Sequence, residues 1–148
     1  MDYLVPTLIP GALAVDDRGQ VAFVNEFNPA DAGVKRTYLT SNHRAGLVRA
    51  WHGHHRERKW VMAVSGSALV CTVVIDPIPG LEEEVERFVL SASKPAILAI
   101  PPGYANGCMS LTEDARLLWF SSATVEESRV DDVRFEARRW NPWAVEDR

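Results

Sequence analysis

Apolar and β-branched residues recur along the chain in short runs separated by turn residues. The runs that predict strands are 21–24, 47–51, 60–64, 68–75, 85–90, 96–100 and 115–120. Clusters of Gly, Pro, Asp and Ser at 16–19, 65–67 and 101–103 are typical of the turns between them. This spacing predicts an all-β domain, a sandwich or a barrel, over residues 1–148. Residues 125–140 mix charged and apolar side chains at loosely helical spacing, which predicts one short helix near the C-terminus.

Composition narrows the class of protein. The 148 residues are 47% hydrophobic, which suits one core in a single domain. With 16 Lys and Arg against 20 Asp and Glu, the net charge of -4 argues against general binding to nucleic acid or an anionic membrane, although a local anion pocket stays open. We expect a cytoplasmic protein, because no membrane span or secretory signal is recognisable. Cys71 and Cys108 lie in apolar runs and are expected to be buried thiols.

Three of the four histidines lie in one short segment at the end of an apolar strand. His52 and His54 should project to the same face of that strand, since side chains alternate with period two, whereas His55 belongs to the turn or to the other face. Such a pair allows three interpretations: a metal site, acid–base catalysis or a purely structural pair. The spacing of His52, His54 and Glu57 is similar to the first metal-binding motif of the cupins. The position of a further ligand holds Asn106, a poor ligand for transition metals, so no metal is expected.

Acid–base catalysis agrees with the residues around the histidines. A neutral imidazole can remove a proton from carbon when an adjacent carbonyl acidifies it and a cation stabilises the enolate. Lys59 opens the next strand, and a short hairpin would bring its ammonium group over the same pocket as His52. Arg18, Arg36 and Arg49 are further cations, and guanidinium groups suit phosphate oxygens.

The chain resembles the dTDP-4-dehydrorhamnose 3,5-epimerases, which are cupins. The matching segments, in chain order, are Asp-Arg-Gly at 17–19, Leu-Val-Arg-Ala-Trp-His at 47–52, Lys-Trp-Val-Met-Ala-Val-Ser-Gly-Ser at 59–67, Val-Val-Ile-Asp at 73–76, Leu-Ser at 90–91, Ile-Pro-Pro-Gly-Tyr-Ala-Asn-Gly at 100–107 and Arg-Trp-Asn at 139–141. The resemblance covers about residues 15–143. It implies a double-stranded β-helix, the cupin jelly roll, that forms a homodimer and acts on a nucleotide-linked 4-keto-6-deoxy sugar.

By this resemblance the catalytic base falls on His52 and the enolate-stabilising lysine on Lys59. The phosphate-binding arginines fall on Arg18 and Arg49, and we add Arg36 to them. The family's catalytic tyrosine has no counterpart, because Trp119 lies at or near its position. The aspartate that orients the base in longer members also has none.

The remaining candidate site residues are two substrate contacts and a proton donor. We expect Asn106 and Trp119 to contact the substrate. The candidate donors that could replace the family's tyrosine are Tyr104, Tyr38 and His54, the last acting directly or through a water molecule.

Three functions agree with these residues. The first is a nucleotide-sugar epimerase that inverts carbon 3, carbon 5 or both by enolisation and reprotonation. The second is a sugar 3,4-ketoisomerase, since those cupins are similar to this chain through a His-x-His pair, matched by His52 and His54. The third is a non-catalytic module that binds a nucleotide sugar. No redox cofactor is expected for either enzyme, because the substrate already contains the ketone.

Overall fold

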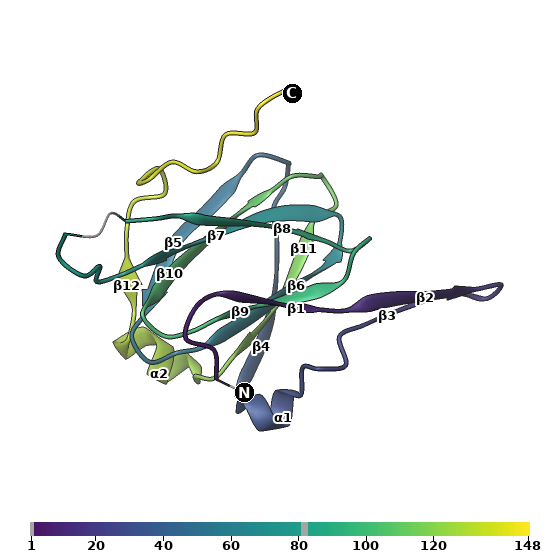
Figure 1. The fold of residues 1–148 in the computed structure, drawn as a ribbon, viewed down its shortest axis with the longest axis horizontal. Coiled ribbons are helices and arrows are strands. Elements are labelled where there is room, and N and C mark those ends of the chain that lie inside the picture. Colours follow the sequence, from purple (N-terminus) through teal and green to yellow (C-terminus); the bar gives the residue numbers. More distant parts are fainter. Residues whose placement is uncertain (1, 81–82) are drawn as a thin grey trace.

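The fold consists of two five-stranded antiparallel sheets that face each other, as seen in the computed structural model, which describes residues 2–80 and 83–148 (Figure 1). The first sheet has, in spatial order, β1 (Thr7–Pro10), β9 (Ala96–Ile100), β6 (Lys59–Ser65), β11 (Arg116–Ser121) and β4 (Arg36–Ser41). The second has β12 (Val133–Arg134), β5 (Val48–His54), β10 (Tyr104–Ser110), β7 (Ser67–Val74) and β8 (Glu86–Ser91). Because the chain alternates between the sheets from β5 to β7 and again from β9 to β11, the topology is that of a jelly roll, and the all-β prediction is confirmed.

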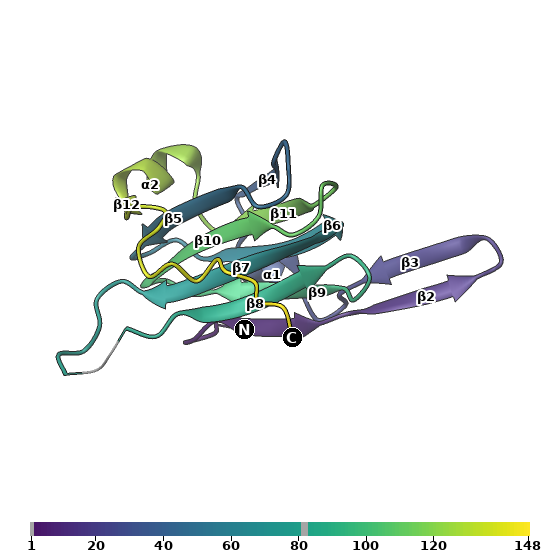
Figure 2. The same cartoon turned by 90° about the horizontal axis from the view of Figure 1, so that it is seen from above.

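The remaining elements are a hairpin and two short helices. The strands β2 (Ala12–Asp16) and β3 (Gly19–Phe23) form a two-stranded sheet that extends away from the body of the molecule (Figure 2). The helix α1 (Pro29–Ala32) begins after Asn28, whose side chain accepts hydrogen bonds from the first backbone N–H groups. The helix α2 (Val125–Val130) begins with a capping box between Thr124 and Glu127, so the predicted C-terminal helix is confirmed. None of the helices in the described part of the chain is long and apolar enough to cross a membrane.

Each strand predicted from an apolar run corresponds to one of β3, β5, β6, β7, β8, β9 and β11. The sequence did not predict β1, β2, β4, β10 or β12. In β4 and β10 the apolar residues are interrupted by Arg, Thr, Ser, Asn and Gly, because one face of each strand lines a polar pocket.

The main core lies between the two sheets. Val61 and Leu98 of the first sheet pack there with Val70 and Leu90 of the second, all of them almost fully buried. This closes the space between the sheets at one end and leaves a pocket at the other.

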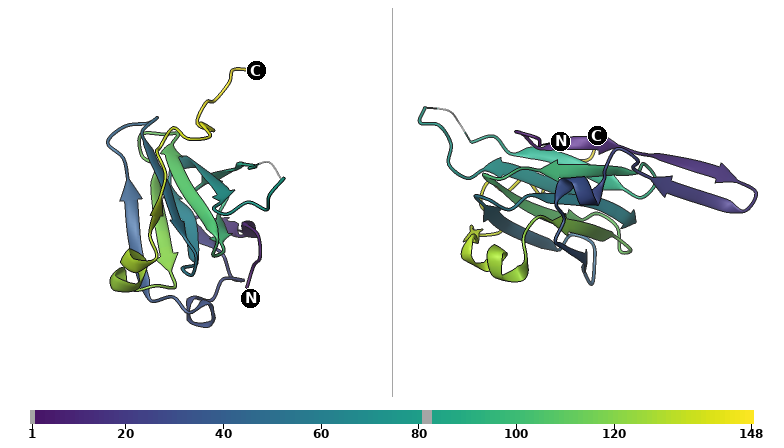
Figure 3. Two further views of the ribbon diagram at one scale, coloured as in Figure 1. Left: turned by 90° about the vertical axis from the view of Figure 1, so that its left-hand side faces the viewer. Right: turned by 90° about the horizontal axis from the view of Figure 1, so that it is seen from below.

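The C-terminal segment covers the outer face of the second sheet (Figure 3). Trp143 and Trp140 pack there against Trp51, which is fully buried. A Cβ atom at position 107 would lie 2.5 Å from the Ala50 Cβ atom and 3.0 Å from the Trp143 ring, so this close approach requires Gly107. The tryptophans of the Arg-Trp-Asn region therefore anchor the tail and do not line the pocket.

Candidate functional site

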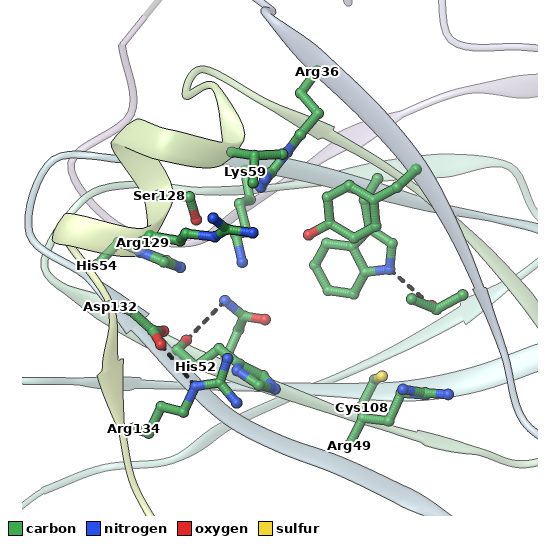
Figure 4. A pocket seen from close by; sticks show the side chains of 15 residues that line it. Arg36, Arg49, His52, His54, Lys59, Cys108, Ser128, Arg129, Asp132 and Arg134 are labelled. Atoms are coloured by element: carbon green, nitrogen blue, oxygen red, sulfur yellow. Dashed lines mark hydrogen bonds and ion pairs between the residues drawn. The ribbon is translucent and has the colours of Figure 1, made fainter.

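A pocket of about 270 Å³ opens between the sheets beside α2 (Figure 4). Its walls come from both sheets and from the C-terminal segment. The lining residues are Arg36, Tyr38, Thr40, Arg49, His52, His54, Lys59, Asn106, Cys108, Trp119, Val125, Ser128, Arg129, Asp132 and Arg134. Of the site residues expected from sequence, the pocket brings together Arg36, Arg49, His52, His54, Lys59, Asn106 and Trp119.

Strand β5 supplies Arg49, His52 and His54 to the pocket. His52 and His54 share a face because they are two residues apart, as predicted. Arg49 joins them through a β-bulge: Asn106 pairs with His52 and Cys108 pairs with Arg49, so β5 uses one residue more than β10 over this step. The two residues inside the bulge, Ala50 and Trp51, pack against the outer cluster instead.

Residue His52 is a half-buried imidazole surrounded by cations. Burial lowers its pKa, and the positive charges of Lys59 and Arg134 lower the pKa further. Strand β12 places Arg134 directly opposite His52 in the sheet register. The backbone carbonyl of His52 accepts a hydrogen bond from Asn106 Nδ2 at 3.2 Å. The His52 side chain is therefore neutral at pH 7 and can accept a proton.

Residue His54 is held through its Nδ1 atom. This atom lies 2.9 Å from the backbone carbonyl oxygen of Asp131 and 3.1 Å from Glu57 Oε2. Burial and the charge of Lys59 lower the His54 pKa, while the charge of Glu57 opposes this shift.

A loop after β5 carries Glu57, which is only 4% exposed. The Asp131 carboxylate accepts hydrogen bonds from the backbone N–H groups of His55, Arg56 and Glu57 at 2.9, 2.9 and 3.0 Å, and so fixes this loop to the end of α2. The exposed His55 side chain lies outside the pocket.

Strand β6 begins with Lys59, which is 8% exposed and reaches the pocket from the sheet opposite to the histidines. Burial lowers the pKa of Lys59, and the negative charge of Glu57 acts against this shift. The ammonium group lies 5.9 Å from the centroid of the Trp119 ring, within reach of a cation–π interaction.

Strand β4 lines the same wall with Arg36, Tyr38 and Thr40, which are spaced two residues apart. Tyr38 stacks on Trp119 with ring centroids 6.0 Å apart and planes 7° from parallel. Trp119 Nε1 donates a hydrogen bond to Thr40 Oγ1 at 2.9 Å, which fixes the indole. Burial and the charge of Glu57 raise the pKa of Tyr38, so its phenol stays protonated.

Guanidinium groups surround the pocket. Arg36 comes from the first sheet, Arg49 and Arg134 come from β5 and β12 of the second, and Arg129 comes from α2, as Figure 4 shows. Neither Arg129 nor Arg134 was expected at the site from the sequence. The capping box at Thr124 is a local sequence signal for the start of α2, which carries Arg129. Arg134 reaches His52 only because β12 pairs with β5, and no local signal predicts this pairing.

Two expected site residues do not line this pocket. Tyr104 lies at the start of β10 and packs against the edge of the main core, outside the pocket lining. Arg18 lies at the tip of the β2–β3 hairpin, with 86% of its side chain exposed, and forms an ion pair with Asp16. Within the chain described here, Arg18 therefore has no contact with the pocket. Tyr104 and Arg18, both expected at the site, are thus not brought to His52 by the fold of this chain.

The two cysteines are free and buried, as expected. Burial raises the Cys108 pKa to about 11, so this pocket residue is an uncharged thiol at pH 7. Within residues 2–80 and 83–148, no three His, Cys, Asp or Glu side chains lie together so as to hold a metal ion.

Comparison with known families identifies the chain. Residues 7–137 match the FdtA family, described as WxcM-like, C-terminal. The chain belongs to this family. No curated protein sequence matches this WxcM-like chain.

Solved structures share its cupin fold. The dTDP-4-dehydrorhamnose 3,5-epimerase from Sulfolobus tokodaii is 24% identical, with a TM-score of 0.78 over 97% of this chain and 83% of that one. The enzyme of the same name from Bacillus anthracis, with TDP and PPi bound, is 18% identical, with a TM-score of 0.76 over 96% and 86%. A double mutant of the QdtA 3,4-ketoisomerase from Thermoanaerobacterium thermosaccharolyticum, in complex with TDP, is 21% identical, with a TM-score of 0.67 over 95% and 99%. The expected jelly roll of the epimerases, the RmlC-like cupin fold, is thus confirmed for the WxcM-like chain.

Proposed function

We propose that this protein is a nucleotide-sugar isomerase that enolises a dTDP-linked or other NDP-linked 4-keto-6-deoxy sugar, with epimerisation at carbon 3, carbon 5 or both as its reaction. The observation that carries the proposal is the pocket in which His52 faces Lys59 from the opposite sheet. Among similar folds, the named activities include those of 3,5-epimerases and a 3,4-ketoisomerase.

Enolisation needs a base and a cation, and the pocket offers both. The neutral His52 imidazole takes the proton from the carbon next to the ketone. The electron pair of the broken C–H bond forms the C=C bond of the enolate. The Lys59 ammonium group stabilises the negative charge on the enolate oxygen. Because Lys59 is 8% exposed, its charge acts on the oxygen with little screening by water.

The diphosphate has guanidinium partners. Arg49 lies on the same face of β5 as His52 and is separated from it by the bulge. A phosphate group bound by Arg49 would therefore lie apart from the carbon that reacts with His52. Arg36 shares this pocket, and its Nε atom is buried without a hydrogen-bond partner among the described residues. Such an unpaired donor favours an anionic ligand.

Epimerisation also needs a proton donor on the other side of the sugar. His52 belongs to the second sheet and Tyr38 to the first, so a sugar bound between the sheets would meet them on opposite faces. The raised pKa of Tyr38 keeps the phenol protonated, as a donor must be. We therefore assign the donor role to Tyr38 instead of Tyr104.

A 3,4-ketoisomerase is the second candidate, and one observation favours it. His52 and His54 both line the pocket from one face of β5, so two bases are available on one side of the sugar. Such a pair could carry a proton between neighbouring carbons 3 and 4 without inversion.

The protein is also proposed to be a homodimer. The β2–β3 hairpin exposes Val15 by 73% and Val21 by 63%, and an isolated two-stranded hairpin is marginally stable in water. Packing this hairpin on a second copy would bury these side chains and give Arg18 a route to the partner's pocket. Sedimentation analysis of Val21→Asp tests this, with a shift from dimer to monomer as the expected result.

Proton NMR of dTDP-4-keto-6-deoxyglucose in heavy water tests the activity. The protein should remove the signal of the proton at carbon 3 or carbon 5, and the product's coupling constants separate epimerisation from ketone transfer. His52→Ala should lower the rate of exchange by roughly 100-fold or more. His43→Ala, at an exposed histidine, should leave this rate unchanged.

Absence of exchange with 4-keto sugars, together with tight binding of TDP, would contradict the isomerase proposal. That pair of results would support the non-catalytic nucleotide-sugar-binding module.

A further inference from the structure

We infer that Glu57 is a positioning residue that holds the His54 imidazole with its proton on Nδ1 and its bare Nε2 atom toward the pocket. The role in turnover rests on the proposed isomerase function, whereas the state of the imidazole does not. The resemblance to the epimerases implies an aspartate that orients the base and has no counterpart here, whereas Glu57 and its contact with His54 come from the structure.

The tautomer follows from the partners of Nδ1. The Asp131 carbonyl oxygen at 2.9 Å can only accept a hydrogen bond, and the Glu57 carboxylate at 3.1 Å also accepts. Both neighbours therefore require a proton on Nδ1. In the neutral ring the Nε2 atom then has the free lone pair.

The carboxylate is held from several sides. Glu57 Oε1 accepts hydrogen bonds from Ser121 Oγ and, at 3.1 Å, from Arg36. Glu57 Oε2 accepts from Ser128 Oγ at 2.8 Å and faces His54 Nδ1. Only 1% of the Glu57 side chain is exposed. A buried carboxylate with this many hydrogen-bond donors around it has a fixed orientation.

The charges around His54 set the balance. Lys59 on β6 and His52 on β5 disfavour its protonation, whereas Glu57 and Asp131 favour it, and Arg36 on β4 partly neutralises Glu57. In the 3,4-ketoisomerase reaction, where His54 is the second base, Nε2 takes a proton from substrate carbon, the C–H electron pair remains on the enolate and the ring becomes an imidazolium. Glu57 lies beside that new charge and stabilises it.

Two structural facts link this pair to α2. Ser128 of α2 donates a hydrogen bond to Glu57, and the backbone carbonyl of Asp131, the residue that caps α2, accepts one from His54. Glu57, the carboxylate partner of His54, therefore comes from the loop after β5. The residues that hold this pair in place, Ser128 and Asp131, come from the C-terminal part of the chain.

The test is nitrogen-15 NMR of the histidine rings in the full-length protein without any sugar. In the wild type, His54 should be the Nδ1–H tautomer. Glu57→Gln should shift the tautomer population toward Nε2–H and lower the His54 pKa, because the charge that favours protonation is removed. Glu127→Gln, at an exposed carboxylate of α2 that pairs with Lys35, is the matched control and should change neither quantity.

Ser128→Ala gives a test of opposite sign if Glu57→Gln does not fold. Without the hydroxyl donor, the Glu57 charge is less neutralised, so the His54 pKa should rise. A wild-type Nε2–H tautomer, or an unchanged tautomer and pKa in both variants, would overturn the inference.

Turnover provides a second readout. With a 4-keto sugar substrate, Glu57→Gln should lower kcat roughly tenfold or more and leave KM nearly unchanged. An equal loss in Glu127→Gln would overturn the positioning role. If the wild type shows the Nδ1–H tautomer but no exchange with any 4-keto sugar, the proposed function fails and the state of His54 stands.

Discussion

Arg49 and His52 lie on the same face of β5 and line the same pocket, although they are three residues apart. A regular strand would place them on opposite faces, because side chains alternate with period two. The bulge at Ala50 and Trp51 adds the extra residue and turns both of these side chains toward the outer cluster. One irregular step thus brings a guanidinium group to the same pocket as a candidate base.

The phenol of Tyr38 should separate proton removal from inversion. In Tyr38→Phe, His52 and Lys59 remain, so deuterium exchange at the carbon next to the ketone should persist. Formation of the inverted product should fall by roughly 100-fold, because the donor on the opposite sheet is lost. Proton NMR measures both quantities in one sample. Tyr104→Phe is the control outside the pocket, and equal losses in the two variants would contradict the donor role of Tyr38.

The Lys59 ammonium group should determine the alkaline limit of activity. Burial lowers the pKa of Lys59, so kcat/KM should decline at a pH below the ordinary lysine value of about 10.4. Lys59→Arg keeps a positive charge at high pH and should remove that decline, with kcat reduced roughly 10- to 100-fold by the altered geometry. The measurement is the pH profile of the exchange rate. An unchanged alkaline decline in Lys59→Arg would contradict the role of Lys59. Lys94→Arg, at an exposed lysine, serves as the control.

Nucleotide binding should depend on Arg49. Arg49→Met removes the guanidinium group and should raise the dissociation constant for TDP roughly tenfold, which corresponds to about 1.4 kcal/mol. Calorimetry at two salt concentrations should also show a weaker salt dependence for the variant. Arg116→Met, at an exposed position of β11 outside the pocket, is the control. Equal affinity in the wild type and Arg49→Met would refute this role.

The Asp131 carboxylate should make stability depend on pH. Burial acts to raise its pKa, but the backbone N–H groups of His55, Arg56 and Glu57 outweigh this, and the pKa lies below its ordinary value. Because the folded pKa is lowered, this stabilisation is present above about pH 3.9 and is lost as the pH falls through the folded pKa.

The corresponding variant is Asp131→Asn. Urea unfolding should give a loss of about 1–3 kcal/mol at pH 7 and a smaller loss at pH 3. Asp17→Asn, in the exposed turn of the hairpin, should cost little at either pH. A pH-independent difference for Asp131→Asn would contradict the role of the charge.

Much of the fold could be predicted from local pattern. The apolar runs of β6, β7, β8, β9 and β11 became strands because their side chains fill the core between the sheets, and the capping box at Thr124 and Glu127 set the start of α2. Strands β4 and β10 escaped prediction because their inner faces carry pocket residues such as Arg36 and Asn106 instead of a continuous apolar face. Polar lining weakens the local signal at the place where the site forms.

The sequence by itself determined the all-β class and the pairing of His52 with His54, since both depend on the spacing of neighbours along one strand. Only the tertiary structure decided that Arg49 joins that face, that Tyr38 stacks on Trp119, and that Glu57 and Asp131 meet at His54. The contacts of Tyr38 with Trp119 and of Asp131 with His54 join segments far apart in the sequence. Their positions depend on which strands are neighbours and where a strand bulges, and local residue patterns do not encode these features.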